Sequence, residues 1–265
     1  CYGTYLAPDD TSGTRSILDA LEAGYRLIDT ASVYGNEKTV GRAVRESSIP
    51  REEIFITSKV WNTDQGYEST LSAFDASLNR LETDYLDLYL IHWPIPAGYE
   101  KDYRDLNRET WKAMERLYKE GQARAIGVSN FLPRHLEALM EQADTIPMVN
   151  QLEINPRYHQ TEAVAFCREH GILVESWGPL ARGGVLEEPV LRRIADKHKK
   201  SVAQICLRWE LQRGIVPLPK SVHADRIKAN LDVFGFSLDG EDMALIDTLD
   251  APGHYSIHPD HLSEE

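Results

Sequence analysis

The sequence predicts an α/β fold in which eight parallel strands, each followed by a helix, close into a single-domain (β/α)8 TIM barrel. Four stretches repeat one design of helix, glycine and strand, and four further runs raise the number of expected strands to eight. The length of 265 residues agrees with the ~250 residues typical of this barrel. No shift in composition marks a linker, so we expect residues 1–265 to form one domain.

Apolar residues at helical spacing lead to a glycine in each repeated stretch. The stretches are 17–30, 113–130, 162–178 and 203–221, and their glycines are Gly24, Gly121, Gly171 and Gly214. Glycine is favoured just past a helix end because it tolerates a positive φ. The short apolar run after each glycine therefore predicts a strand that follows a helix, and strands joined by such crossovers run parallel.

The remaining strands are predicted from apolar runs between these stretches. They are "CYGTYL" at the start of the chain, "IFITSKV" (54–60), "LDLYLIH" (86–92) and "MVNQLEI" (148–154). Because the chain opens on a strand end and lacks an initiator Met, we expect native residues to precede Cys1. A doubly wound sheet is the main alternative, but it usually carries a G-x-G-x-x-G turn, and the pair at 183–184 lacks that spacing.

Composition excludes several classes of protein. Acidic residues outnumber basic ones by 42 to 29, and the net charge of −13 repels nucleic acid and anionic membrane surfaces. No run approaches the roughly 18 to 20 apolar residues of a membrane-spanning helix. The three cysteines, Cys1, Cys167 and Cys206, form no CxxC pair, which favours a reducing cytoplasm over a disulfide framework.

Polar or aromatic residues stand at the carboxyl end of every expected strand. In chain order they are Thr4, Asp29, Lys59, His92, Ser129 with Asn130, Gln151, Trp177, and Lys220 with Ser221. All these ends face one opening of a barrel, where the active sites of this fold lie. A single Lys or His at a strand end is usually just a surface residue, but the whole set predicts a functional site.

Asp29, Tyr34, Lys59 and His92 form the candidate catalytic group. Asp29 and Lys59 end neighbouring strands, so an ion pair between them would offset the cost of burying either charge. Tyrosine has a pKa of about 10, and a nearby ammonium lowers that pKa by stabilising the phenolate. Tyr34 would then donate a proton to a carbonyl oxygen that receives a hydride, while His92 hydrogen-bonds the same oxygen.

Each of these residues also has a structural explanation when taken alone. Tyr34 could pack on the rim, Asp29 and Lys59 could be a structural ion pair, and His92 could be a core histidine. Their convergence at neighbouring strand ends favours the catalytic interpretation.

The motifs around these residues resemble the aldo-keto reductase family. Seven of them follow the family pattern in order across residues 24–230: "GYRLIDTASVYGNE", "IFITSKVWN", "YLDLYLIHWP", "AIGVSNF", "NQLEINP", "SWGPLARGG" and "VPLPKSVHADRIKAN". The motif "SWGPL", with its Trp, is most similar to the bacterial 2,5-diketo-D-gluconate reductase branch of the family. The resemblance implies an NAD(P)H-dependent barrel in which Tyr34 is the acid, supported by Asp29, Lys59 and His92.

The resemblance also implies which residues bind the nicotinamide half of the cofactor. Ser129, Asn130 and Gln151 would hydrogen-bond the carboxamide, which needs both donors and acceptors. Trp177 would stack on the nicotinamide ring, at a position where many relatives carry Tyr. We also assign Thr4, at the end of the first strand, to the cofactor site.

The adenosine half would lie along the loop after the seventh strand and the helix after the eighth. The matching positions are Gly178, Leu180 and Gly183 for the pyrophosphate, Lys220, Ser221, Val222 and Arg226 for the 2′-phosphate, and Asn230 for adenine. A helix N-terminus with Ser, Lys and Arg suits a phosphate dianion, so we predict NADPH over NADH. Position 229 is Ala where many relatives have Glu, which weakens the expected grip on adenosine.

The substrate is predicted to be an aldehyde or ketone. Family members that reduce a steroid carbon–carbon double bond have Glu at position 92, whereas His accompanies carbonyl reduction. The pocket is expected from the loops 94–106 and 181–188 and from four side chains: Tyr5, Trp61, Asn62 and Trp93. Small keto sugars and keto acids, 2-oxoaldehydes such as methylglyoxal, and β-keto esters all fit, and we expect a monomeric enzyme.

Two other classes of function remain open from the sequence. A barrel lyase or isomerase would use Lys59 as a Schiff base, which requires a desolvated Lys without a carboxylate partner, and Asp29 argues against it. An NADP(H)-binding regulatory protein with little turnover is the alternative to the reductase.

Three further features are interpreted as structural. His254, His258 and His261 invite a metal site, but Pro259 interrupts their spacing and we expect no metal. Cys167 with His170 is a lone CxxH at a helix end. Asp87 stands early in the fourth strand, where we expect a capping or rim residue.

Overall fold

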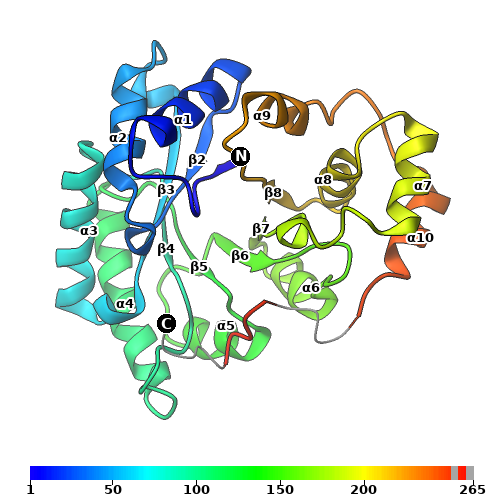
Figure 1. The fold of residues 1–265 in the computed structure, drawn as a ribbon. Coiled ribbons are helices and arrows are strands. Elements are labelled where there is room, and N and C mark those ends of the chain that lie inside the picture. Colours follow the sequence, from blue (N-terminus) through cyan, green and yellow to red (C-terminus); the bar gives the residue numbers. More distant parts are fainter. Residues whose placement is uncertain (252–255, 261–265) are drawn as a thin grey trace.

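The computed structural model describes residues 1–251 and 256–260, which form the expected barrel of parallel strands (Figure 1). The strands are β1 (Tyr2–Gly3), β2 (Leu27–Asp29), β3 (Phe55–Val60), β4 (Leu88–Ile91), β5 (Ile126–Ser129), β6 (Val149–Glu153), β7 (Leu173–Trp177) and β8 (Val216–Leu218). Each strand pairs in parallel with the next, in chain order from β1 to β8. The backbone N–H of Gly3 donates to the carbonyl of Pro219 at 3.1 Å, which brings the end of β8 beside β1.

Helices surround the strands on the outside (Figure 1). They are α1 (Thr11–Ala23), α2 (Glu37–Glu46), α3 (Tyr67–Leu81), α4 (Tyr103–Lys119), α5 (Pro133–Met140), α6 (Thr161–Glu169), α7 (Pro189–His198), α8 (Val202–Gln212), α9 (Ala224–Leu231) and α10 (Gly240–Asp247). The four predicted helix-ending glycines all have a positive φ, between 69° at Gly171 and 112° at Gly24. The prediction of helices that end on these glycines is therefore confirmed.

The apolar core lies mainly between the strands and the surrounding helices. Side chains such as Ile28, Val128 and Trp209 are wholly buried there. A second, small apolar cluster of Leu88, Leu90 and Val149 is separate from it. Because side chains alternate between the two faces of a strand, Glu175 and Trp177 share one face of β7 and Ser176 lies on the other.

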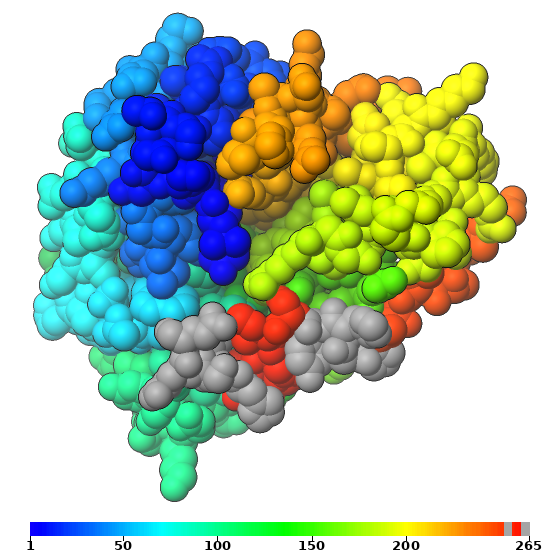
Figure 2. Space-filling model, viewed as in Figure 1, coloured from blue at the N-terminus to red at the C-terminus, as the bar shows by residue number. Residues whose placement is uncertain are grey.

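The described part of the C-terminal tail, residues 256–260, is tied to the carboxyl ends of the strands. Glu153, the last residue of β6, accepts hydrogen bonds from the backbone N–H and the hydroxyl of Ser256, both at 2.8 Å. Asp260 pairs with Arg134 and lies 3.2 Å from His135, both at the start of α5. In the space-filling view, the tail (red) reaches the same face as the N-terminal loop (blue) and the segment after β7 (yellow-green) (Figure 2).

Candidate active site

Tyr34, Lys59 and Asp29 meet at the carboxyl ends of β2 and β3. Tyr34 ends a short 3-10 turn, Ser32–Tyr34, and Gly35 follows it with a φ of 70°. The Ser32 hydroxyl donates to the backbone carbonyl of Lys59 at 3.1 Å, which ties this turn to β3. The Lys59 ammonium lies 2.7 and 2.9 Å from the two carboxylate oxygens of Asp29 and 3.4 Å from the Tyr34 hydroxyl.

The Asp29–Lys59 pair is almost completely removed from solvent. Lys59 is 0% exposed and Asp29 is 3% exposed. Burial alone lowers the pKa of Lys59, but the charge of Asp29 and the contact with Tyr34 outweigh it, so that pKa is raised. Lys59 is therefore charged. A buried ammonium that has a carboxylate partner is the opposite of the neutral amine that a Schiff-base enzyme requires.

The predicted direction of the Tyr34 pKa was wrong. Lys59 does lower the pKa of the Tyr34 phenol, but burial raises it by more, and the negative charge of Asp29 adds to the increase. The net pKa is therefore above its ordinary value. Tyr34 consequently keeps its proton at neutral pH, which is the form that a proton donor needs.

His92 lies against Tyr34 and is electrically neutral. Burial, together with the charge of Lys59, holds the pKa of its imidazole well below the ordinary value. The two rings are in edge contact, with centroids 5.7 Å apart, and Trp61 makes a similar contact at 5.0 Å. The Nδ1 atom of His92 is buried and has no hydrogen-bond partner among the described residues.

Ser129, Asn130, Gln151 and Trp177 come together beside this group, as predicted. The Ser129 hydroxyl donates to the backbone carbonyl of Gln151 at 2.8 Å. Asn130 adopts a φ of 64° and donates from Nδ2 to the Ser129 hydroxyl and to the backbone carbonyl of His92. The indole Nε1 of Trp177 donates to Oδ1 of Asn130 at 2.8 Å.

Gln151 joins the amide cluster to the catalytic group. Its Nε2 donates to Oδ2 of Asp29 at 2.8 Å and to Oε2 of Glu175 at 2.9 Å. Glu175 was not predicted from the sequence as a site residue. The available signal was its position two residues before Trp177, which places both side chains on one face of the strand.

The predicted cofactor positions beyond Trp177 lie on two segments, the loop after β7 and the segment from the end of β8 through α9. In the loop after β7, Gly178 and Gly183 have φ values of 67° and 95°, and Leu180 begins the turn Ala181–Gly183. Val222 and Arg226 are exposed, and Asn230 is half-buried on α9.

The two cations near the start of α9 have no acidic partner in residues 1–251 and 256–260. Neither Lys220 nor Arg226 forms an ion pair with a described residue. Lys220 donates to the backbone carbonyl of Leu6 at 3.3 Å, and burial lowers the pKa of its ammonium. The Ser221 hydroxyl accepts the backbone N–H of His223 at 3.1 Å.

Thr4 is wholly buried at the end of β1. Its hydroxyl donates to the backbone carbonyl of Asp29 at 2.9 Å, so it supports the end of β2. A contact between Thr4 and a cofactor stays a prediction.

Three of the four predicted pocket residues, Tyr5, Trp61 and Trp93, contact Tyr34 or His92. Tyr5 is 45% exposed, and its ring lies 5.1 Å from that of Tyr34. Trp93 stacks on His92 with 12° between the ring planes. Asn62 is 9% exposed, and its Oδ1 is buried without a partner among the described residues. These side chains form an aromatic cluster with a few polar atoms.

The residues at this mouth suit a nicotinamide dinucleotide. Side-chain amides and a hydroxyl gather beside the candidate acid, as a carboxamide requires. Lys220 and Arg226, which form no ion pair within the described part of the chain, stand out in a protein with a net charge of −13, and they suit a phosphate.

The remaining predicted features have structural roles or lie outside the described residues. Asp87 accepts the backbone N–H of Ile56 and pairs with Arg51 and Arg124, so it is a capping residue as expected. Cys167 is buried and accepts a hydrogen bond from Asn150. His254 and His261 lie outside the described residues, so the idea of a histidine metal site is not tested.

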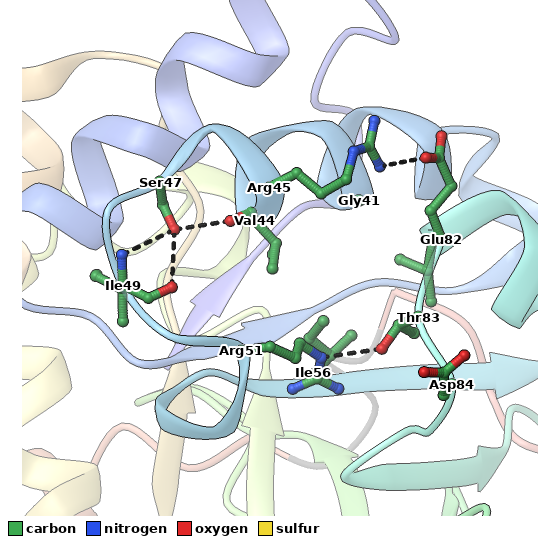
Figure 3. Close-up of a pocket in the computed structure, with 11 residues that line it drawn as sticks. Gly41, Val44, Arg45, Ser47, Ile49, Arg51, Ile56, Glu82, Thr83 and Asp84 are labelled. Atoms are coloured by element: carbon green, nitrogen blue, oxygen red, sulfur yellow. Dashed lines mark hydrogen bonds and ion pairs between the residues drawn. The ribbon is translucent and has the colours of Figure 1, made fainter.

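A cavity of about 320 Å³ lies at the opposite end of the barrel, between α2 and α3 (Figure 3). Its cations are already engaged, because Arg45 pairs with Glu82 and Arg51 donates to Thr83. Among the described residues, this cavity therefore offers no uncommitted cation to a ligand. Among the described residues, no helix has the length and apolar character to span a membrane.

The fold and the site define a TIM-barrel protein with a tyrosine hydroxyl beside a buried lysine–aspartate ion pair. The sequence profile of the Aldo/keto reductase family matches residues 2–251, and the chain belongs to that family. Glyoxal reductase of Bacillus subtilis (strain 168) is 52% identical over 260 residues, covering 98% of this chain and 91% of that protein.

Solved structures agree with this assignment. An aldo/keto reductase from Brucella melitensis superposes with a TM-score of 0.88 at 49% identity, covering 94% of this chain and 93% of its own. A variant of Gox0644 in complex with NADPH gives a TM-score of 0.92 at 40% identity, covering 100% of this chain and 93% of its own. The chain is thus an oxidoreductase of a family that acts on small carbonyl compounds with a nicotinamide cofactor.

Proposed function

We propose that this protein is an NADPH-dependent reductase that converts small aldehydes and ketones to alcohols, with Tyr34 as the proton donor. The observation that carries the proposal is the Tyr34 hydroxyl 3.4 Å from the Lys59 ammonium, which is held by both carboxylate oxygens of Asp29. When bound, the cofactor supplies a hydride to the carbonyl carbon. The chain supplies the proton to the carbonyl oxygen.

Each catalytic side chain has a defined part in moving that proton. Tyr34 holds it on the phenol oxygen, because burial keeps the pKa of this group high. Lys59 stabilises the phenolate that remains after transfer, and Asp29 keeps Lys59 charged. Neutral His92 offers a ring nitrogen to the same carbonyl oxygen and so orients the substrate against Tyr34.

The cofactor would be held by residues already grouped at the mouth. Ser129, Asn130 and Gln151 would bind the carboxamide, and Trp177 would cover the ring. Support for NADPH over NADH comes from Lys220 and Arg226 near the start of α9, which pair with no acid in residues 1–251 or 256–260, and from the NADPH complex of Gox0644.

The substrate would be a small carbonyl compound. The aromatic walls around Tyr34 suit a compact substrate, and a relative at 52% identity is named glyoxal reductase. We therefore place 2-oxoaldehydes such as methylglyoxal first, ahead of keto sugars, keto acids and β-keto esters.

The test is the loss of NADPH absorbance in the presence of methylglyoxal, 2,5-diketogluconate, a β-keto ester and an aromatic aldehyde. Tyr34→Phe keeps the ring but removes the proton, so turnover should fall by about 100-fold or more while NADPH affinity is retained. Tyr85→Phe, which removes a hydroxyl from a ring held between Arg51 and Arg124, is the matched control.

Two results would contradict the proposal. NADPH binding without turnover of any carbonyl would favour the regulatory alternative. Equal turnover by wild type and Tyr34→Phe would remove Tyr34 from the role of acid.

A further inference from the structure

Glu175 is an acid inside the barrel that the proposed chemistry does not use. It is 2% exposed, and it lies directly beside Gln151 in the pairing of β6 with β7. Its Oε2 accepts a hydrogen bond from Nε2 of Gln151 at 2.9 Å. It forms no ion pair with any residue in the described part of the chain.

Burying a carboxyl group at this position is costly. Burial, together with the negative charge of Asp29, raises the pKa of Glu175 to about 7. An apolar side chain of similar size would fill the same space without that cost. A buried acid that forms no ion pair with a described residue, beside a candidate site, points to a role in that site.

The hydrogen bond from Gln151 gives Glu175 a role in positioning the Gln151 amide. Gln151 has two amide hydrogens on Nε2, and the other one is directed at Oδ2 of Asp29, 2.8 Å away. Turning the amide over would set its carbonyl oxygen against the Asp29 carboxylate and, whenever Glu175 is ionised, against a second acceptor, which is unfavourable because acceptors repel. With both carboxyls in place, the amide is held in one orientation, and its Oε1 points away from both of them.

Asp29 alone would not hold the Gln151 amide in one orientation. A single acceptor leaves the amide free to rotate about the bond to that acceptor, and the second acceptor removes this freedom. Gln151 is one of the groups proposed to bind the nicotinamide carboxamide. Its Oε1 is the acceptor that remains for the amide hydrogens of a ligand.

We propose that Glu175 is a positioning residue that holds the Gln151 amide in the orientation required to bind the carboxamide of a nicotinamide cofactor. This inference rests on the proposed function, because it assumes that the mouth binds such a cofactor. It predicts an effect confined to the nicotinamide end of the ligand. The residues proposed to bind the adenosine end, near α9, are not among the hydrogen-bond partners of Gln151, which are Asp29 and Glu175 for its Nε2.

The experiment is isothermal titration of the full chain with two probes, NADP+ and 2′-phospho-ADP-ribose, which lacks the nicotinamide. Glu175→Leu removes the acceptor and keeps the volume, so NADP+ should bind about tenfold more weakly, with no change for 2′-phospho-ADP-ribose. Glu175→Gln keeps an acceptor oxygen and should restore most of the NADP+ affinity. If Glu175→Leu does not fold, Glu175→Met tests the same loss of the hydrogen-bond acceptor.

Glu210→Gln is the matched control. Glu210 is also wholly buried and also contacts β7, but on the opposite face, through the Ser176 hydroxyl. Its substitution should leave both affinities unchanged.

Two results would overturn the inference. Wild-type affinity of Glu175→Leu for NADP+ would show that Glu175 does not act through Gln151. Equal weakening of both probes would show a general structural role. Failure of the wild type itself to bind NADP+ would instead contradict the proposed function on which the inference rests.

Discussion

The indole Nε1 of Trp177, at the end of β7, donates a 2.8 Å hydrogen bond to Oδ1 of Asn130, at the end of β5. Asn130 in turn adopts a left-handed backbone conformation with a φ of 64° and donates to the carbonyl of His92. The bond therefore connects the residue proposed to cover the nicotinamide ring with one proposed to hold its carboxamide.

Trp177→Phe should weaken NADP+ binding by about fivefold, because it keeps an aromatic face but removes the donor to Asn130. Asn130→Ala should weaken binding as well, and the double variant should be less affected than the sum of the two, since both remove one bond. Titration calorimetry of the three variants measures the coupling. Strict additivity of the two effects would contradict a functional link between these residues.

Asp29→Leu should lower the free energy of unfolding by about 3–5 kcal/mol, because it leaves the Lys59 ammonium buried without its partner. The double variant Asp29→Leu with Lys59→Met should recover much of that stability, although it should have no reductase activity. Urea unfolding measures both effects.

The exposed pair of Arg116 and Glu120 is the control for this comparison. Arg116→Ala should change the free energy of unfolding by less than about 1 kcal/mol, because surface ion pairs contribute little. An equally small change in the free energy of unfolding for Asp29→Leu would show that Lys59 does not need the Asp29 charge to stay buried.

Glu210 makes stability depend on pH. It is wholly buried against Ser176, and burial raises the pKa of its carboxyl well above the ordinary value. A raised pKa means that the folded state binds the proton more tightly, so the contribution to stability is full below the unfolded pKa of about 4.5 and is lost as pH rises towards the folded pKa.

Glu210→Gln should therefore be more stable than the wild type at about pH 8 and should differ little at about pH 4. Melting temperatures across that range, measured for both proteins, test the sign. A wild type that gains stability relative to the variant as pH rises would show that Glu210 is ionised in the folded protein.

Asp260 should fix the tail against the barrel. It pairs with Arg134 and lies 3.2 Å from His135. Asp260→Ala should speed cleavage by a protease within residues 256–260, while the urea midpoint should stay unchanged because the tail adds little to the core. Cleavage at the wild-type rate would show that the Glu153–Ser256 contacts suffice to hold the tail.

Local patterns in the sequence determined the order of helices and strands and the composition of the catalytic group. Strand ends can be located because apolar runs end in polar residues, and helix ends because glycines such as Gly24 take a positive φ. Once eight parallel strands are expected, barrel geometry brings their carboxyl ends together. Asp29, Lys59 and His92 could be grouped on that basis alone.

Only the tertiary structure decided properties that depend on burial and on contacts across the barrel. The net pKa of Tyr34 rises because desolvation outweighs a single nearby ammonium, and no sequence spacing states how deeply a loop residue is buried. Glu175 meets Gln151 on the neighbouring strand, and Asp29 reaches the same amide from 122 residues away. Such encounters are set by the closure and register of the barrel, because these determine which inward-facing side chains share one layer.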